Sequence, residues 1–204
     1  MEIKDRILVA AVELFMRNGI RSVSMDDIAA QLGMSKKTLY KWFENKDQIV
    51  LAVMQQHVAQ EECNCHEVFA TGNNALEAMF NLIQWHKEML SRIHPSIFHD
   101  LQKYYPQAWA VFEQHKNTFI LQKTVDNIRR GMEEGLYRPD LDVDVLARLH
   151  LAEIELMFNS AVFPTRQFSI QRVNSVMVEH FLMGMSTLKG HKLINEYRQV
   201  TEID

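Results

Sequence analysis

The chain has 204 residues, 47% of them hydrophobic, and a formal net charge of −4. This hydrophobic content excludes a disordered chain, and only 7 glycines and 4 prolines leave few breaks, which favours long helices over a β fold with many turns. The net charge argues against a general nucleic-acid binder. However, residues 1–50 hold 8 Lys and Arg against 7 Asp and Glu, so the acidic surplus lies in the rest of the chain.

No segment of the sequence suits a membrane span or a secretory leader. No window approaches about eighteen consecutive apolar residues, and charges are spread through residues 1–20. We therefore expect a cytoplasmic protein without membrane contact.

The first predicted helix runs from about residue 2 to residue 18 and stops at Gly19. Its apolar residues recur at helical spacing and predict one buried stripe, which consists of Ile3, Ile7, Ala11, Leu14 and Phe15. We expect this stripe to close over apolar residues of the next two helices and to form a small core with Ile28, Leu32, Leu39 and Phe43.

Residues 24–46 predict two short helices, a tight turn between them and the start of a third helix. Ser24, Ser35 and Asn45 are each suited to an N-cap, and Gly33 suits the left-handed conformation that ends a helix. Helices this short are not stable alone, so they must pack on the first helix. The first two of them form a helix-turn-helix.

The second helix of this pair presents an outer face that consists of Lys36, Lys37, Thr38, Tyr40 and Lys41. Ammonium groups, hydroxyls and a flat aromatic ring suit the phosphates and base edges of a DNA groove. Taken alone, the same pattern also fits a solvated, lysine-bearing face on a small helical hairpin.

The surrounding pattern closely resembles the DNA-binding segment of the tetracycline-repressor (TetR) family of bacterial transcription regulators. The resemblance covers about residues 3–50 and rests on residues 28–35, 38–43 and 45–47, which read IAAQLGMS, TLYKWF and NKD. It implies an all-α fold of about nine helices. A helix-turn-helix DNA-binding domain at 1–48 would precede a helical ligand-binding and dimerisation domain at 49–204.

The resemblance also implies a role for particular residues in binding double-stranded DNA. Lys36, Lys37 and Thr38 would specify sequence, while Tyr40 and Lys46 would hold backbone phosphates. The full set of expected DNA-binding residues is Ser24, Ser35, Lys36, Lys37, Thr38, Tyr40, Lys41, Trp42 and Lys46. Many relatives have glycine where this chain has Lys37, so the base preference does not carry over.

The remainder of the chain predicts further helices at about 46–69, 75–93, 96–104, 106–132, 142–163 and 169–189. Residues 131–142 resemble, more weakly, the loop before the eighth helix of the same family. Large flexible or aromatic residues are frequent between residues 79 and 119, which is usual for a helical core. In similar proteins these helices enclose an apolar cavity for a small inducer, so we expect a pocket lined by Trp85, Met89, His94, Tyr104, Trp109 and Phe112.

The last two long predicted helices carry apolar stripes at spacings of three and four residues. Packing within the subunit is one interpretation. In similar proteins these helices form a four-helix dimer interface, so we expect a homodimer whose interface includes Ile154, Phe158, Val173, Met177, Phe181 and Gly184.

Two alternatives to a ligand-responsive repressor on a palindromic operator stay open. Cys63 and Cys65 could serve a metal- or redox-sensing regulator, although residues two apart on a helix point in different directions. A ligand carrier or an enzyme on this scaffold is the other alternative. No phosphate-binding loop, nucleophile elbow or supported pair of carboxylates is present, so we expect no enzyme activity, no cofactor and no metal.

Overall fold

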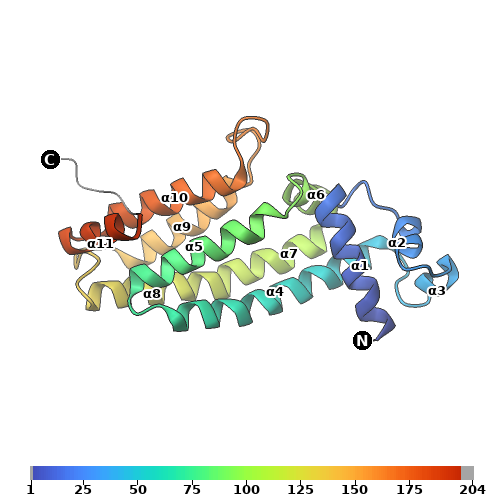
Figure 1. The fold of residues 1–204 in the computed structure, drawn as a ribbon, viewed down its shortest axis with the longest axis horizontal. Coiled ribbons are helices and arrows are strands. Elements are labelled where there is room, and N and C mark those ends of the chain that lie inside the picture. The colour runs from blue at the N-terminus through green and yellow to red at the C-terminus, as the bar shows by residue number, and fades with distance from the viewer. Residues whose placement is uncertain (1, 199–204) are drawn as a thin grey trace. The chain divides into compact units, whose positions relative to one another are not determined.

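Helices make up the regular structure of the computed structural model, which describes residues 2–198 (Figure 1). The first are α1 (Ile3–Asn18), α2 (Met25–Gln31), α3 (Lys36–Tyr40) and α4 (Lys46–Thr71). They are followed by α5 (Ala75–Ser91), α6 (Ile97–Tyr104), α7 (Pro106–His115), a π-helical segment (Lys116–Ile120) and α8 (Leu121–Glu133). The last are α9 (Val143–Met157), α10 (Ile170–Met185) and α11 (Leu188–Arg198). Residues 2–198 include no β-strand, so the predicted all-α fold is confirmed.

The chain folds as two compact units. Unit 1 takes the chain up to Glu61 and adds residues 92–115, which hold α6 and α7. Unit 2 takes residues 62–91 and the chain from Lys116 onward. The predicted boundary between 1–48 and 49–204 stays a prediction about function. The packing itself groups α6 and α7 with the helix-turn-helix, which the sequence did not indicate.

The small core of the helix-turn-helix forms largely as predicted. Ile7, Ala11, Ile28 and Leu39 are each fully buried, and Phe15 is nearly so, while α1 packs on α2 and α2 packs on α3. Two residues of the expected stripe are less buried, because Ile3 is 41% exposed and Leu14 is half-buried.

Unit 2 has its own apolar core between α5, α8, α9, α10 and α11. The buried ring of Tyr137 lies in it, and its Oη donates to Oδ1 of Asn127 at 3.1 Å. Nδ2 of Asn127 in turn donates to the carbonyl oxygen of Ala75 at 2.9 Å. A Cβ on Gly131 would lie 2.0 Å from the Tyr137 ring, so only glycine lets this ring pack here. Burial raises the pKa of the Tyr137 hydroxyl.

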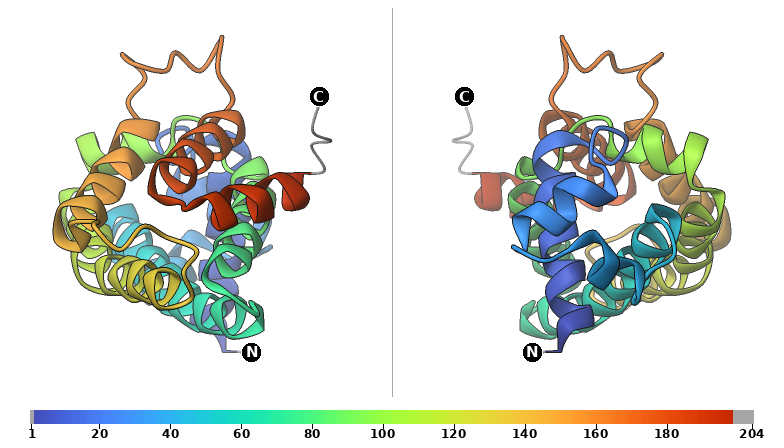
Figure 2. Two further views of the ribbon diagram at one scale, coloured as in Figure 1. Left: turned by 90° about the vertical axis from the view of Figure 1, so that its left-hand side faces the viewer. Right: turned by 90° about the vertical axis from the view of Figure 1, so that its right-hand side faces the viewer.

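Two predicted helices are divided in the structure. The helix expected at 106–132 changes to π-helical geometry at Lys116–Ile120 between α7 and α8. The helix expected at 169–189 ends at Met185, because Ser186 takes an extended conformation and α11 then begins. Both views of Figure 2 also show that residues 158–169 (orange) project as a non-helical connection between α9 and α10. Within residues 2–198, no helix has the length and apolar content that crossing a membrane requires.

Candidate nucleic-acid interface

The start of α2 is fixed by a capping box. Oγ of Ser24 accepts the backbone N–H of Asp27 at 3.2 Å, and Oδ2 of Asp27 accepts the backbone N–H of Ser24 at 2.8 Å. The same Oδ2 atom accepts the Ser24 hydroxyl at 2.6 Å. The side-chain and backbone hydrogen bonds from Ser24 hold the pKa of the Asp27 carboxyl below its ordinary value. The predicted N-cap at Ser24 is therefore confirmed. The Asp27 carboxylate lies where the exposed N–H groups of the helix favour negative charge.

The turn between α2 and α3 depends on Gly33. This residue has a φ of 62°, and the backbone N–H of Met34 donates to the carbonyl oxygen of Ala29 at 3.0 Å. Such a left-handed residue ends a helix and redirects the chain. Ser35 then caps α3, because its Oγ accepts the backbone N–H of Thr38 at 3.1 Å.

α3 separates an apolar inner face from a cationic outer face. Leu39 is fully buried, whereas Tyr40 is 47% exposed. The exposed side chains of α3 and the turn that follows it are Lys36, Lys37, Tyr40, Lys41 and Trp42. Lys36 forms an exposed ion pair with Asp26, whose hydrogen bond raises the pKa of the lysine. Exposed ion pairs contribute little to stability, so this lysine is available for exchange onto a phosphate or base.

Lys46 differs from the other expected DNA-binding residues. It is the first residue of α4 and is half-buried, and its Nζ donates to the backbone carbonyls of Ile20 and Val23 at 3.2 and 2.9 Å. Its ammonium is thus directed at the protein backbone and does not extend the exposed face of α3. Sequence reasoning missed this placement, because the carbonyls that bind it come from another part of the chain.

The residues expected to line a ligand pocket are divided between the two units, so this pocket stays a prediction. Trp85 and Met89 belong to unit 2, whereas the other four belong to unit 1. Within unit 1, the ring centres of Trp109 and Phe112 lie 5.1 Å apart, but Tyr104 contacts Arg21. The sixth residue, His94, lines a pocket within unit 1.

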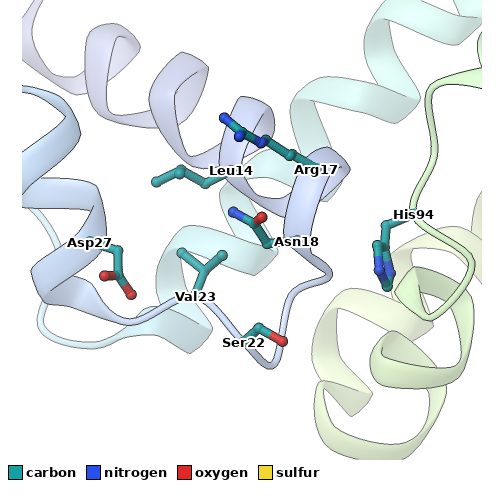
Figure 3. Close-up of a pocket in the computed structure, with 7 residues that line it drawn as sticks. All are labelled: Leu14, Arg17, Asn18, Ser22, Val23, Asp27 and His94. Atoms are coloured by element: carbon teal, nitrogen blue, oxygen red, sulfur yellow. The ribbon is translucent and has the colours of Figure 1, made fainter.

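That pocket, of about 520 Å³, lies within unit 1. Figure 3 shows its lining, with Leu14, Arg17 and Asn18 from α1, Asp27 from α2 and His94 from the segment before α6. Ser22 and Val23 complete the lining and come from the loop between α1 and α2. Its lining includes the charged side chains Arg17 and Asp27, and the sequence did not predict this pocket.

The residues expected at a dimer interface divide into two groups. Val173 and Phe181 are each 5% exposed and lie within the protomer, where Phe181 stacks on the His150 ring at 4.6 Å. These two side chains therefore pack inside their own subunit, and their place in a dimer interface stays a prediction. Gly184 is exposed, and the other three are half-buried: Ile154, Phe158 and Met177.

The outward apolar residues of α9 and α10 differ from those expected. The exposed fractions of Val145, Leu149 and Leu156 on α9 are 60%, 49% and 39%, and that of Val176 on α10 is 59%. On α9 these residues follow helical spacing and share one face. We call the face of Val145, Leu149, Leu156 and Val176 the α9/α10 apolar face.

The two cysteines lie in different environments on α4, with Cys63 exposed and Cys65 buried. In the described part of the chain, no three side chains of His, Cys, Asp or Glu are grouped so that they could hold a metal ion.

Comparisons with known proteins identify the family. Residues 7–53 match the pattern that defines "Bacterial regulatory proteins, tetR family". The chain is 30% identical over 184 residues to an HTH-type transcriptional regulator, YvaF, of Bacillus subtilis. The aligned region covers 89% of this chain and 94% of that protein. This chain belongs to the tetR family.

Two further relatives extend this result. The transcriptional repressor KstR2 of Mycobacterium tuberculosis is 25% identical over 148 residues, which is 71% of this chain and 74% of that protein. The crystal structure of the transcriptional regulator FadR of Bacillus subtilis in complex with stearoyl-CoA has the same fold, with a TM-score of 0.65 at 19% identity. The match covers 88% of this chain and 98% of that one.

Family membership fixes the class of function. The chain is a ligand-responsive, DNA-binding transcription regulator with an N-terminal helix-turn-helix. Its relatives are transcription regulators, and they give no support to the metal- or redox-sensing alternative.

Proposed function

We propose that this protein is a repressor that binds a palindromic operator as a homodimer and is released by a small, largely apolar effector. The observation that carries the DNA-binding part is the exposed face of α3. It presents Lys36, Lys37 and Tyr40 to solvent above a buried Leu39, on a helix whose start Ser35 caps. A short capped helix of this kind fits the major groove, which is about 12 Å wide.

In this proposal, Lys36, Lys37 and Thr38 contact base edges, while Tyr40 and Lys41 contact phosphates. Lysine ammonium groups suit guanine O6 and N7 as well as phosphate oxygens. Ser24 and Ser35 are already engaged as caps through their Oγ atoms, so in the proposed complex they lie at the DNA without serving as its main ligands.

The α9/α10 apolar face supports the homodimer. Large apolar side chains that are exposed together often mark a protein–protein interface. In a two-fold dimer of helix-turn-helix proteins, the two recognition helices contact successive major grooves, about 34 to 36 Å apart along one side of the duplex. This geometry requires a palindromic operator.

Two buried polar atoms in unit 2 support an effector site there. Nδ2 of Asn174 on α10 has no hydrogen-bond partner among the described residues, although Asn174 is only 8% exposed. Nδ1 of His150 on α9, a residue 7% exposed, also makes no hydrogen bond there and lies 3.6 Å from Oε2 of Glu153. Buried polar atoms are satisfied in the great majority of cases, so such atoms mark places where a bound group completes the structure. We propose that they bind the polar end of a mostly apolar effector.

One experiment tests the central proposal. Purified protein would capture fragments of the source genome, and sequencing the captured DNA would give the operator. Lys37→Ala should weaken operator binding and change the preferred base at one position, whereas Lys87→Ala, an exposed lysine on α5, should leave both unchanged. Capture of no enriched fragment would contradict the proposal, and so would equal operator affinity for the two variants.

The effector is tested with the captured fragment and stearoyl-CoA as the probe. Release of DNA requires that the effector bind the free form better than the DNA-bound form, and the two ligands then weaken each other by the same factor, about 5- to 150-fold. If stearoyl-CoA binds tightly but leaves the affinity for DNA unchanged, it is not an effector of this protein.

A further inference from the structure

The loop from Gly19 to Val23 joins α1 to α2, and three of its carbonyl oxygens converge on one cation. Nζ of Lys46 lies 3.2 Å from the carbonyl oxygen of Ile20 and 2.9 Å from that of Val23. The carbonyl oxygen of Arg21 lies 3.5 Å from the same atom. An ammonium has three N–H donors, so these three carbonyls account for all of them.

α6 holds the same loop at a second point. Asp100 is only 5% exposed, and its Oδ2 accepts the backbone N–H of Arg21 at 3.2 Å and the Oγ–H of Ser96 at 3.1 Å. Nη1 of Arg21 donates to Oη of Tyr104 at 3.1 Å, with the guanidinium 4.8 Å from the centre of the Tyr104 ring. α6 therefore binds both the backbone and the side chain of Arg21.

The two attachments meet at the end of α6. The buried ring of Tyr105, which follows α6 directly, lies with its centre 5.7 Å from Nζ of Lys46. Close packing does not fix the loop on all sides, because the pocket lined by Ser22, Val23 and His94 opens beside it (Figure 3). The loop is therefore held both by the buried side chains of Ile20 and Val23 and by the hydrogen bonds from α4 and α6.

We propose that Lys46 and Asp100 are positioning residues, which hold the loop on α4 and α6 and thereby set where α2 and α3 lie. The loop leads directly into Ser24, the N-cap of α2, so a displacement of the loop displaces the start of the helix-turn-helix. A shift of α6 then reaches the helix-turn-helix through Asp100 without passing along α4. The proposal rests on the proposed function, in which α3 contacts DNA.

This assignment differs from the phosphate-binding role that sequence resemblance implied for Lys46. The two roles give different salt dependence, because removing one lysine–phosphate interaction lowers the slope of log affinity against log salt by about one unit. The test variant is Lys46→Met, which keeps an apolar chain of similar length beside Tyr105. Lys41→Met, from the exposed end of α3, serves as the comparison for a lysine proposed to contact phosphate.

We expect Lys46→Met to weaken binding to the captured genomic fragment about tenfold, the factor expected when one charged hydrogen bond is removed, with the salt slope unchanged. Asp100→Ala should do the same, although it removes a negative charge and would strengthen DNA binding if charge alone mattered. Asp100→Asn keeps an acceptor for the Arg21 N–H and should restore most of the affinity. Lys41→Met should lower the salt slope.

Hydrogen exchange of the free protein gives a measurement that does not need DNA. The Arg21 amide should exchange faster in Asp100→Ala and Lys46→Met than in the parent protein, while amides in the α2–α3 core, such as that of Leu39, stay protected. A salt slope lowered by about one unit in Lys46→Met would overturn the proposal, because it would show that Lys46 binds a phosphate. Unchanged exchange at Arg21 in both variants would also overturn it, whether or not the protein binds an operator.

Discussion

Replacing Gly19 with alanine tests how the loop between α1 and α2 is held. Gly19 has a φ of 78° and a ψ of 154°, a combination that residues with a Cβ atom rarely adopt. Holding such a residue there costs about 1 to 3 kcal/mol. A Cβ at this position would also lie 2.5 Å from Oγ of Ser96, closer than van der Waals contact allows.

The overlap with Ser96 is relieved most cheaply by rotation of the Ser96 side chain about its Cα–Cβ bond, which moves Oγ away. That rotation breaks the hydrogen bond from Oγ to Oδ2 of Asp100, which is 3.1 Å long. A hydrogen bond to a charged group contributes about 1.5 to 3 kcal/mol. Adding the backbone cost, and subtracting about 0.4 to 1 kcal/mol for the stiffer unfolded chain, we expect Gly19→Ala to lower the free energy of unfolding by about 2 to 5 kcal/mol.

Gly33→Ala provides the matched control. Gly33 has a φ of 62°, but no atom lies within 4 Å of the position its Cβ would take. Its replacement should therefore incur only the backbone cost, which is about 1 to 2 kcal/mol for a left-handed residue. Urea unfolding followed by circular dichroism measures both variants, with each midpoint interpreted at constant slope.

A double-mutant cycle separates the contact with Ser96 from the backbone cost. If the overlap is real, Ser96→Gly should remove part of the penalty of Gly19→Ala, and the coupling between the two should be about 0.5 to 3 kcal/mol. Our reasoning would be refuted by Gly19→Ala being no more destabilising than Gly33→Ala, or by a coupling of zero.

Three further predictions concern the rest of the molecule. Leu149→Glu, in the α9/α10 apolar face, should convert the proposed dimer to a folded monomer in sedimentation, whereas an unchanged dimer would exclude this face. Asn127→Ala leaves the buried Tyr137 hydroxyl without its acceptor and removes one hydrogen bond to the Ala75 carbonyl, so urea unfolding should show a loss of about 2 to 4 kcal/mol; a loss below about 0.5 kcal/mol would contradict the network. The Asp27 carboxyl has a pKa below its unfolded value, so the stabilisation it gives is present above about pH 4 and is lost as pH falls below that value. Between about pH 5 and 3, the free energy of unfolding should therefore fall less in Asp27→Asn than in the parent protein.

Much of the helix-turn-helix followed from local sequence. The caps at Ser24 and Ser35 and the turn at Gly33 depend on residues at most five positions apart, and each formed as predicted. Helical spacing likewise identified Leu39 as buried and the lysines beside it as exposed. Local hydrogen bonds and periodicity determine these features, so the sequence alone was enough to predict them.

Which apolar side of α10 packs inside the subunit did not follow from the sequence. Phe181 lies on the apolar stripe that was expected to meet a second copy, but it packs on His150 of the same subunit. α10 has apolar residues on more than one side, so its sequence does not state which side faces inward. The outward side, with Val176, became known only when α5 and α9 were placed against the helix.

Tertiary structure alone decided how the helix-turn-helix is held. The contact between Arg21 and Asp100 joins residues 79 positions apart, and that between Lys46 and Val23 joins residues 23 apart. Neither pair has a local pattern, because a backbone N–H or carbonyl is the same group in every residue and leaves no mark in the sequence. The sequence by itself therefore determined the class of protein and the exposed, lysine-bearing side of α3. Which charges hydrogen-bond to the loop was decided by the backbone groups that folding brings to Lys46 and Asp100.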